Sequence, residues 1–205
     1  MKEATYRMSF TAGGLLVREL STVAEIFIKK ADWQSVEKQV TTTNHLQART
    51  VASSTRIFRE VKHRLAVLDQ KEIRLLVTGD LEEKKAVAWL SVCRVYKIIR
   101  DFALEVINDR FQSYRRDIHF EDFDFLLNRK ASFYPELDSL KDSTRLKLRQ
   151  VTFKMLREVG IISESNKINT LILSDRLLAM VRKKDITELQ LFPCLQQLSA
   201  GSMHE

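Results

Sequence analysis

Apolar side chains recur every three or four residues along most of the chain, the spacing that places them on one face of an α-helix. The most apolar segment begins at Asp80, where Glu83 completes a capping-box pattern, and extends to about Asn108. Because it is apolar nearly all round, we expect it in the middle of a bundle. The pattern predicts helices over residues 15–28, 33–40, 53–68, 70–78, 80–108, 118–131, 143–159, 175–185 and 186–198.

One stretch has the period of two that is typical of a β-strand. Residues 168–173 alternate between two faces, and a polar turn at residues 164–167 separates them from Ile161 and Ile162. Gly160 ends the helix that comes before. We therefore expect a β-hairpin directly after the helix at residues 143–159.

These elements predict a mainly α protein, a multi-helix bundle with a C-terminal winged-helix-like element that contains one short β-hairpin. We assign residues 1–130 to an N-terminal helical bundle and residues 131–205 to the winged-helix-like segment. A single compact domain is the alternative. The last seven residues are expected to form a frayed tail.

The composition indicates which class of partner the protein binds. The 205 residues include only 5 glycines and 2 prolines, which agrees with long helices, and they carry a net charge of +7 with a pI of about 9.5. A basic balance favours a polyanionic partner, either nucleic acid or an anionic membrane surface. Charged residues interrupt every apolar run before it reaches the length of a membrane span, and the first residues lack a signal-peptide pattern, so we expect a cytoplasmic protein. Cys93 and Cys194 are expected to be buried free thiols.

No motif of an enzyme is found: the chain has no P-loop, no HExxH, no nucleophile elbow and no dinucleotide-binding fingerprint. We therefore predict no catalytic residues, no cofactor and no metal. An acidic cluster leaves a metal-dependent nuclease as a minor alternative, although acidic residues also favour the first turn of a helix. The cluster consists of Asp117, His119, Glu121, Asp122 and Asp124.

The helix at residues 143–159 separates its side chains into two stripes. Its apolar stripe is formed by Leu148, Val151, Met155 and Val159, and its polar stripe by Lys147, Gln150, Lys154 and Arg157. Arg145 and Arg149 flank the apolar stripe on its other side. Asp142 or Ser143 is placed to cap the helix, which leaves amide groups for a phosphate.

A helix, a glycine and a hairpin follow one another in the order of a winged helix-turn-helix, in which the helix enters the major groove and the hairpin tip touches the backbone. Lys and Arg can pair with phosphates or guanine, and Gln150 can pair with adenine. The alternative is an amphipathic helix with a solvated basic face beside an incidental hairpin. The predicted nucleic-acid-binding residues are Ser143, Thr144, Arg145, Lys147, Arg149, Gln150, Lys154, Arg157, Asn166, Lys167 and Asn169.

The chain also resembles a known family. The segments MSFTAGGLLVRELSTVAEIFI, TNHLQART, VCRVYKIIRDFALEVI and STRLKLRQVTFKMLREVGII are similar to the BrxA family of bacteriophage exclusion (BREX) phage-defence systems. The resemblance implies an all-helical cytoplasmic protein that works beside other BREX proteins and binds double-stranded DNA. It also implies a likeness to RNA-binding antitermination folds. Some members are labelled inner-membrane proteins, but this sequence lacks a spanning segment.

Two alternatives to DNA binding remain open at this point. One is RNA binding, although aromatic residues, which stack on unpaired bases, are only 8% of the chain and fall mostly on apolar faces. The other is a protein-interaction scaffold of the BREX complex, since Leu146 and Phe153 lie beside the basic stripe and could pack on a partner.

Overall fold

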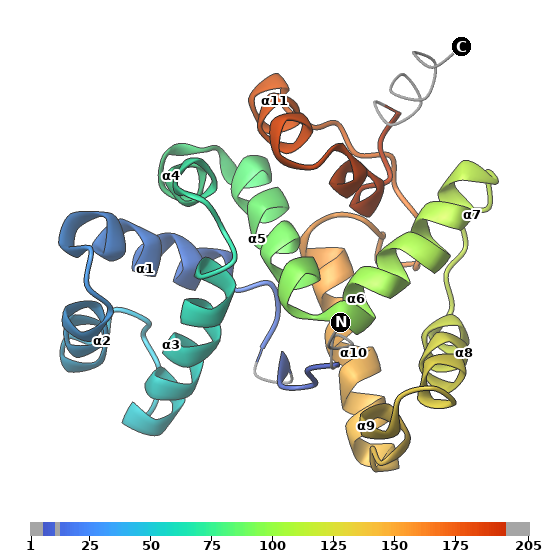
Figure 1. Cartoon of the computed structure of the whole chain (residues 1–205), viewed down its shortest axis with the longest axis horizontal. Coiled ribbons are helices and arrows are strands. Elements are labelled where there is room, and N and C mark those ends of the chain that lie inside the picture. Colours follow the sequence, from blue (N-terminus) through green and yellow to red (C-terminus); the bar gives the residue numbers. More distant parts are fainter. Residues whose placement is uncertain (1–5, 11–12, 196–205) are drawn as a thin grey trace. The chain divides into compact units, whose positions relative to one another are not determined.

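The computed structural model describes residues 6–10 and 13–195, and this part of the chain is mainly helical (Figure 1). The chain divides into two compact units. One is Ala12–Val95, and the other combines Met1–Thr11 with Tyr96–Glu205. The domain boundary that we predicted at residue 130 lies within the second unit, and that division stays a prediction.

The unit Ala12–Val95 is a bundle in which the first helix packs against the other four (Figure 1). Asp32 caps the second helix, as its side chain accepts hydrogen bonds from the amides of Gln34 and Ser35. Asp80 and Glu83 form the predicted reciprocal cap, with distances of 2.8 and 3.1 Å. The helices are α1 (Val17–Lys30), α2 (Trp33–Thr42), α3 (Val51–Leu65), α4 (Gln70–Thr78) and α5 (Leu81–Val95).

The long helix that we predicted from Asp80 to Asn108 is interrupted. Helix α5 ends at Val95, and Tyr96 has an extended backbone (φ −116°, ψ 93°). The Tyr96 side chain is buried, and its ring lies 4.9 Å from the ring of Phe10, so tertiary packing explains a break that periodicity does not reveal. The chain then continues through α6 (Lys97–Phe102), the π-helix η2 (Ala103–Asn108) and α7 (Asp109–Gln112).

The remaining elements of the second unit complete a core rich in phenylalanine. Phe102 lies 5.3 Å from Phe123 and 6.1 Å from Phe153, measured between ring centroids. Phe153 is fully buried, so our expectation that it is available to a partner is wrong. The elements are α8 (Phe120–Ala131), α9 (Pro135–Asp138), α10 (Asp142–Glu158), α11 (Asp175–Lys184) and the 3-10 helix η3 (Ile186–Leu191).

After α10, the β-pairing of the described residues consists only of isolated bridges. Ile162 pairs with Ile168 and Asp117 with Lys167 in antiparallel bridges, and Leu171 pairs with Cys194 in a parallel one. The predicted β-hairpin is therefore not confirmed. The helix predicted over residues 186–198 is a 3-10 helix that stops at Leu191; its last three positions and the predicted frayed tail lie outside the described residues.

Within the second unit, the N-terminal segment packs against the rest through Tyr6, which is buried. Its amide donates to Glu136 at 2.9 Å, and its hydroxyl donates to Asp101. Burial raises the pKa of the Tyr6 phenol, and the hydrogen bond and charge of Asp101 raise that pKa further. The segment is thus part of the fold.

The predicted state of the two cysteines is confirmed, since Cys93 and Cys194 are buried free thiols. Within residues 6–10 and 13–195, none of the helices combines the length and the apolar character that crossing a membrane would require.

Candidate nucleic-acid interface

The two stripes predicted on the helix at residues 143–159 are present on α10. Leu148, Val151, Met155 and Val159 are buried. Lys147, Gln150 and Lys154 are exposed on the other side, and Arg157 is partly exposed. Lys154 makes only a solvent-exposed ion pair with Glu158, at 3.6 Å, and such pairs contribute little to stability. Lys147 and Lys154 are therefore available to an external anion.

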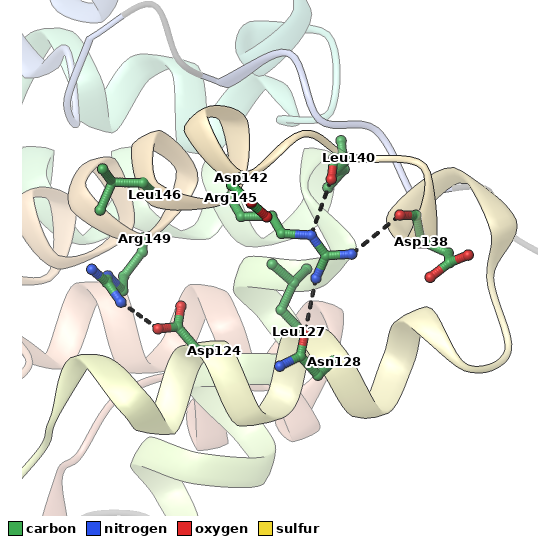
Figure 2. A pocket seen from close by; sticks show the side chains of 9 residues that line it. All are labelled: Asp124, Leu127, Asn128, Asp138, Leu140, Asp142, Arg145, Leu146 and Arg149. Carbon is green, nitrogen blue, oxygen red and sulfur yellow. Dashed lines mark hydrogen bonds and ion pairs between the residues drawn. The ribbon is translucent and has the colours of Figure 1, made fainter.

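Arg145, in contrast, is held inside the fold (Figure 2). Its guanidinium donates to the carbonyl oxygens of Leu137, Asp138 and Leu140, at 2.9, 3.3 and 3.1 Å, and to Asn128 Oδ1 at 2.8 Å. Four hydrogen bonds fix the loop before α10 and join it to α8. Arg145 thus closes a turn of the chain and lies away from the polar stripe.

Arg149 is also engaged. Its guanidinium forms an ion pair with Asp124 of α8 and lies 5.1 Å above the ring of Phe120. Arg145 and Arg149 border the same hollow of about 550 Å³ between α8, α9 and α10, together with Leu146 (Figure 2). Both arginines contact neighbouring helices, and their assignment to the nucleic-acid-binding site stays a prediction.

The C-terminal end of α10 meets the turn that follows it. Arg157 donates to Asn166 Oδ1 at 2.5 Å, and Arg157 Nε lies 3.7 Å from Glu164. Asn169 donates to the carbonyl of Gly160 at 2.9 Å, so its amide stabilises the end of the helix. Lys167 is exposed. The structure therefore brings Arg157, Asn166 and Lys167 together beside α10.

The N-terminus of α10 differs from our expectation. The N-cap residue is Lys141, without a side-chain hydrogen bond, so neither Asp142 nor Ser143 caps the helix. The Lys141 carbonyl accepts from the amides of Thr144 and Arg145, as in an ordinary first turn. Ser143 is exposed and Thr144 is half-buried, which leaves both at the edge of the polar stripe.

The acidic cluster does not converge. Asp122 pairs with Arg110 and accepts from the His119 amide at 2.7 Å, whereas Asp124 pairs with Arg149. In the described part of the chain, no three His, Cys, Asp or Glu side chains are grouped so that they could hold a metal ion. Of the carboxylates that suggested a nuclease, Asp122 and Asp124 are used for helix capping and ion pairs.

A basic surface that we did not predict lies on α3. Arg56, Arg59 and His63 are exposed along one side, with Lys62 half-buried beside them. The Lys62 ammonium lies 5.4 Å from the centre of the Trp33 ring, which fixes its position by a cation–π contact. We call Arg56, Arg59, Lys62 and His63 the α3 face.

The α3 face contains no acidic side chain. Glu60, the helix's one carboxylate, is buried and pairs with buried Arg64 at 2.6 Å. Some exposed cations elsewhere have acidic partners, as in Lys29–Glu25 at 2.7 Å. Within the described residues, Arg56, Arg59 and Lys62 lie in no ion pair, and like charges at this spacing repel each other. One carboxylate lies close by, because Glu37 of α2 borders a hollow together with Arg59, Lys62 and His63. The α3 face is thus predominantly basic.

A signal for this surface exists in the sequence. Between Ser53 and Ala66 the chain has five basic residues, counting His63, and a single acidic one. We interpreted that segment only by its apolar positions. Its polar positions would have indicated the α3 face, but not the burial of Glu60, because the sequence does not show which carboxylates turn inward.

Comparisons with known proteins match one family, BrxA, over nearly the whole chain. A family model described as BrxA matches residues 4–185. Two relatives, both named BREX protein BrxA, come from Escherichia coli O9:H4 (strain HS) and Bacillus cereus (strain H3081.97). The first is 25% identical over 157 residues (77% of this chain, 74% of the relative), and the second 26% identical over 162 residues (79% and 81%).

A solved structure has the same fold. It is described as the crystal structure of an uncharacterized protein from Magnetospirillum magneticum, with a TM-score of 0.78 and 20% identity. The match covers 93% of this chain and 98% of that one. At this identity the likeness shows the fold alone.

Proposed function

The chain belongs to the BrxA family, and we propose that it serves a BREX phage-defence system as a non-catalytic, nucleic-acid-binding component that prefers double-stranded DNA. Its other partners would be further BREX proteins. In this proposal the exposed stripe of α10 acts as a recognition helix in the major groove, and the turn after it as a short wing. The α3 face, in the other unit, binds phosphates as a separate surface.

One observation carries the proposal: exposed basic side chains gather on two helix faces, where Lys147, Arg56 and Arg59 lie in no ion pair within the described residues. On α10, Arg145 and Arg149 have internal partners and lie away from the exposed stripe. Arg157, at the end of the stripe, bonds to Asn166 and lies near Glu164. What remains is Lys147, Gln150 and Lys154, two cations with an amide between them. Lysines bind phosphates as point charges, and the amide of glutamine can pair with adenine.

The test is duplex DNA binding over a range of salt concentrations. The slope of log K against log salt is negative, and each lost phosphate contact makes it less steep by about 0.9. Lys147→Ala/Lys154→Ala should therefore make it less steep by about 2. Lys30→Ala/Lys71→Ala, which removes two exposed lysines from α1 and α4, is the matched control and should bind like the wild type. Failure of the wild-type protein to bind duplex DNA at low salt would contradict the proposal.

RNA is the alternative within the same class, and competition between duplex DNA and duplex RNA decides between them. Preference for RNA would overturn the preference for DNA but not the use of the basic faces.

A protein-interaction scaffold is the second candidate. Leu146 is 45% exposed beside Lys147, and Phe125 and Phe133 are 69% and 75% exposed. Apolar side chains at these levels of exposure suit a partner surface. Co-purification with other BREX proteins that is lost in Phe125→Ser/Phe133→Ser, while DNA binding persists, would support this role.

A further inference from the structure

Tyr114 occupies a backbone position that favours glycine. It has φ 57°, in the left-handed region, directly after the continuous helix that ends with α7. The Arg115 amide donates to the Arg110 carbonyl at 2.8 Å and the Tyr114 amide to the Phe111 carbonyl at 3.2 Å. This is the hydrogen-bond pattern of a Schellman motif, in which the left-handed residue is usually glycine because a Cβ is strained there.

The fold gains no packing in return for this strain. The Tyr114 residue is 81% exposed, so its ring lies mostly in water. Six non-glycine residues have positive φ in the described part of the chain, and Tyr114 is the one aromatic residue among them. For a bulky side chain this conformation is an outlier, and strained backbone of this kind tends to occur at functional sites.

The surroundings of Tyr114 connect it to the α10 surface. In the loop after Tyr114, the Ile118 amide donates to the Asn166 carbonyl at 2.9 Å and the Arg116 carbonyl accepts from the Ile168 amide at 2.7 Å. Asn166 in turn accepts from Arg157 of α10. Tyr114 therefore lies at the start of a loop that is hydrogen-bonded to the turn after α10. That turn includes exposed Lys167.

We propose that Tyr114 stacks on an unpaired nucleobase next to the duplex that α10 binds. Every base has a flat face that a tyrosine ring can cover, and the contact does not depend on sequence. Arg115, whose side chain is 61% exposed, pairs with Asp109 at 2.7 Å, a solvent-exposed ion pair that a phosphate can replace. Exposed Lys167 offers a further cation for the adjoining phosphates. The inference rests on the proposed function and names its preferred substrate: DNA in which a duplex meets unpaired bases.

The test compares a blunt duplex with the same duplex carrying a single-stranded overhang. The wild-type protein should bind the overhang duplex about tenfold more tightly, since stacking on one base has an effect of this order. Tyr114→Gly should abolish the difference, and Tyr114→Phe should keep it. Tyr114→Gly should also raise Tm by about 2–4 °C, because glycine relieves the strained backbone. A loss of the overhang preference in a more stable protein is not explained by misfolding.

The outcomes separate the two proposals. Binding of the blunt duplex with no preference for the overhang would overturn the role of Tyr114 and leave the proposed function intact. A preference that survives in Tyr114→Gly would do the same. Binding of neither duplex at low salt would overturn both.

Discussion

Glu60 and Arg64 form an ion pair within α3, 2.6 Å from Oε1 to Nε, in which both side chains are almost completely buried. Arg64 also donates to the carbonyl oxygens of Gly14 and Leu15, at 3.1 and 3.0 Å. One pair thus fixes the segment before α1 and keeps the helix's carboxylate away from the exposed α3 face.

Breaking this pair should destabilise the protein severely. Arg64→Met leaves the Glu60 charge buried without its partner, so the free energy of unfolding should fall by about 3–5 kcal/mol in urea denaturation. Glu60→Leu/Arg64→Met should recover part of that loss, because no isolated charge remains. Arg56→Ala, on the exposed side, should change stability by no more than about 0.5 kcal/mol. A single variant as stable as the wild type would disprove the structural role.

The α3 face should contribute to DNA binding independently of α10. Arg56→Ala/Arg59→Ala should make the slope of log K against log salt for duplex DNA less steep by about 2, because two phosphate contacts are lost. The double variant Lys30→Ala/Lys71→Ala again serves as the control. An unchanged slope would remove α3 from the interface.

Arg145 should affect stability, not DNA contact. Arg145→Ala removes four hydrogen bonds to α8, α9 and the following loop, and we expect the free energy of unfolding to fall by about 1–3 kcal/mol. Lys147→Ala, two residues away, should leave stability within about 0.5 kcal/mol of the wild type but weaken DNA binding. The reverse pattern would restore Arg145 to the interface.

The cap of α2 should make stability depend on pH. Hydrogen bonds from Ser35 and from the Gln34 amide lower the pKa of Asp32, so the folded state favours its charged form. A depressed carboxyl pKa contributes stability that is present above the unfolded pKa and is lost as the pH falls through the folded pKa. The stability difference between wild type and Asp32→Ala, measured by urea denaturation, should therefore shrink on acidification from about pH 7 to about pH 3. The difference between Asp32→Asn and Asp32→Ala should stay nearly constant, because asparagine caps without titrating.

The helices were the most predictable part of the structure. The apolar period placed α1, α3 and α10 to within a few residues, and Asp32 and Asp80 marked helix starts by chemistry that acts within one turn. Tyr96 was not predictable in this way. Its break depends on contact with Phe10, which is distant in sequence.

The candidate site was predictable only in part. The spacing on α10 correctly separated Lys147 and Lys154 from the buried stripe. It could not show that Arg149 pairs with Asp124 or that Arg145 closes a loop, since both depend on α8, which packs on α10 from elsewhere in the sequence. Alternation at residues 168–173 suggested a strand, but Leu171 pairs with Cys194 in an isolated bridge.

The buried Tyr6 has a practical consequence for dissecting the molecule. Because residues 6–10 belong to the same unit as Tyr96–Glu205, cutting the gene at residue 95 would not yield two intact halves. The C-terminal fragment would lack the tyrosine that bonds to Asp101 and Glu136. A circular permutant, or the missing segment supplied as a separate peptide, is the sounder way to isolate that unit for study.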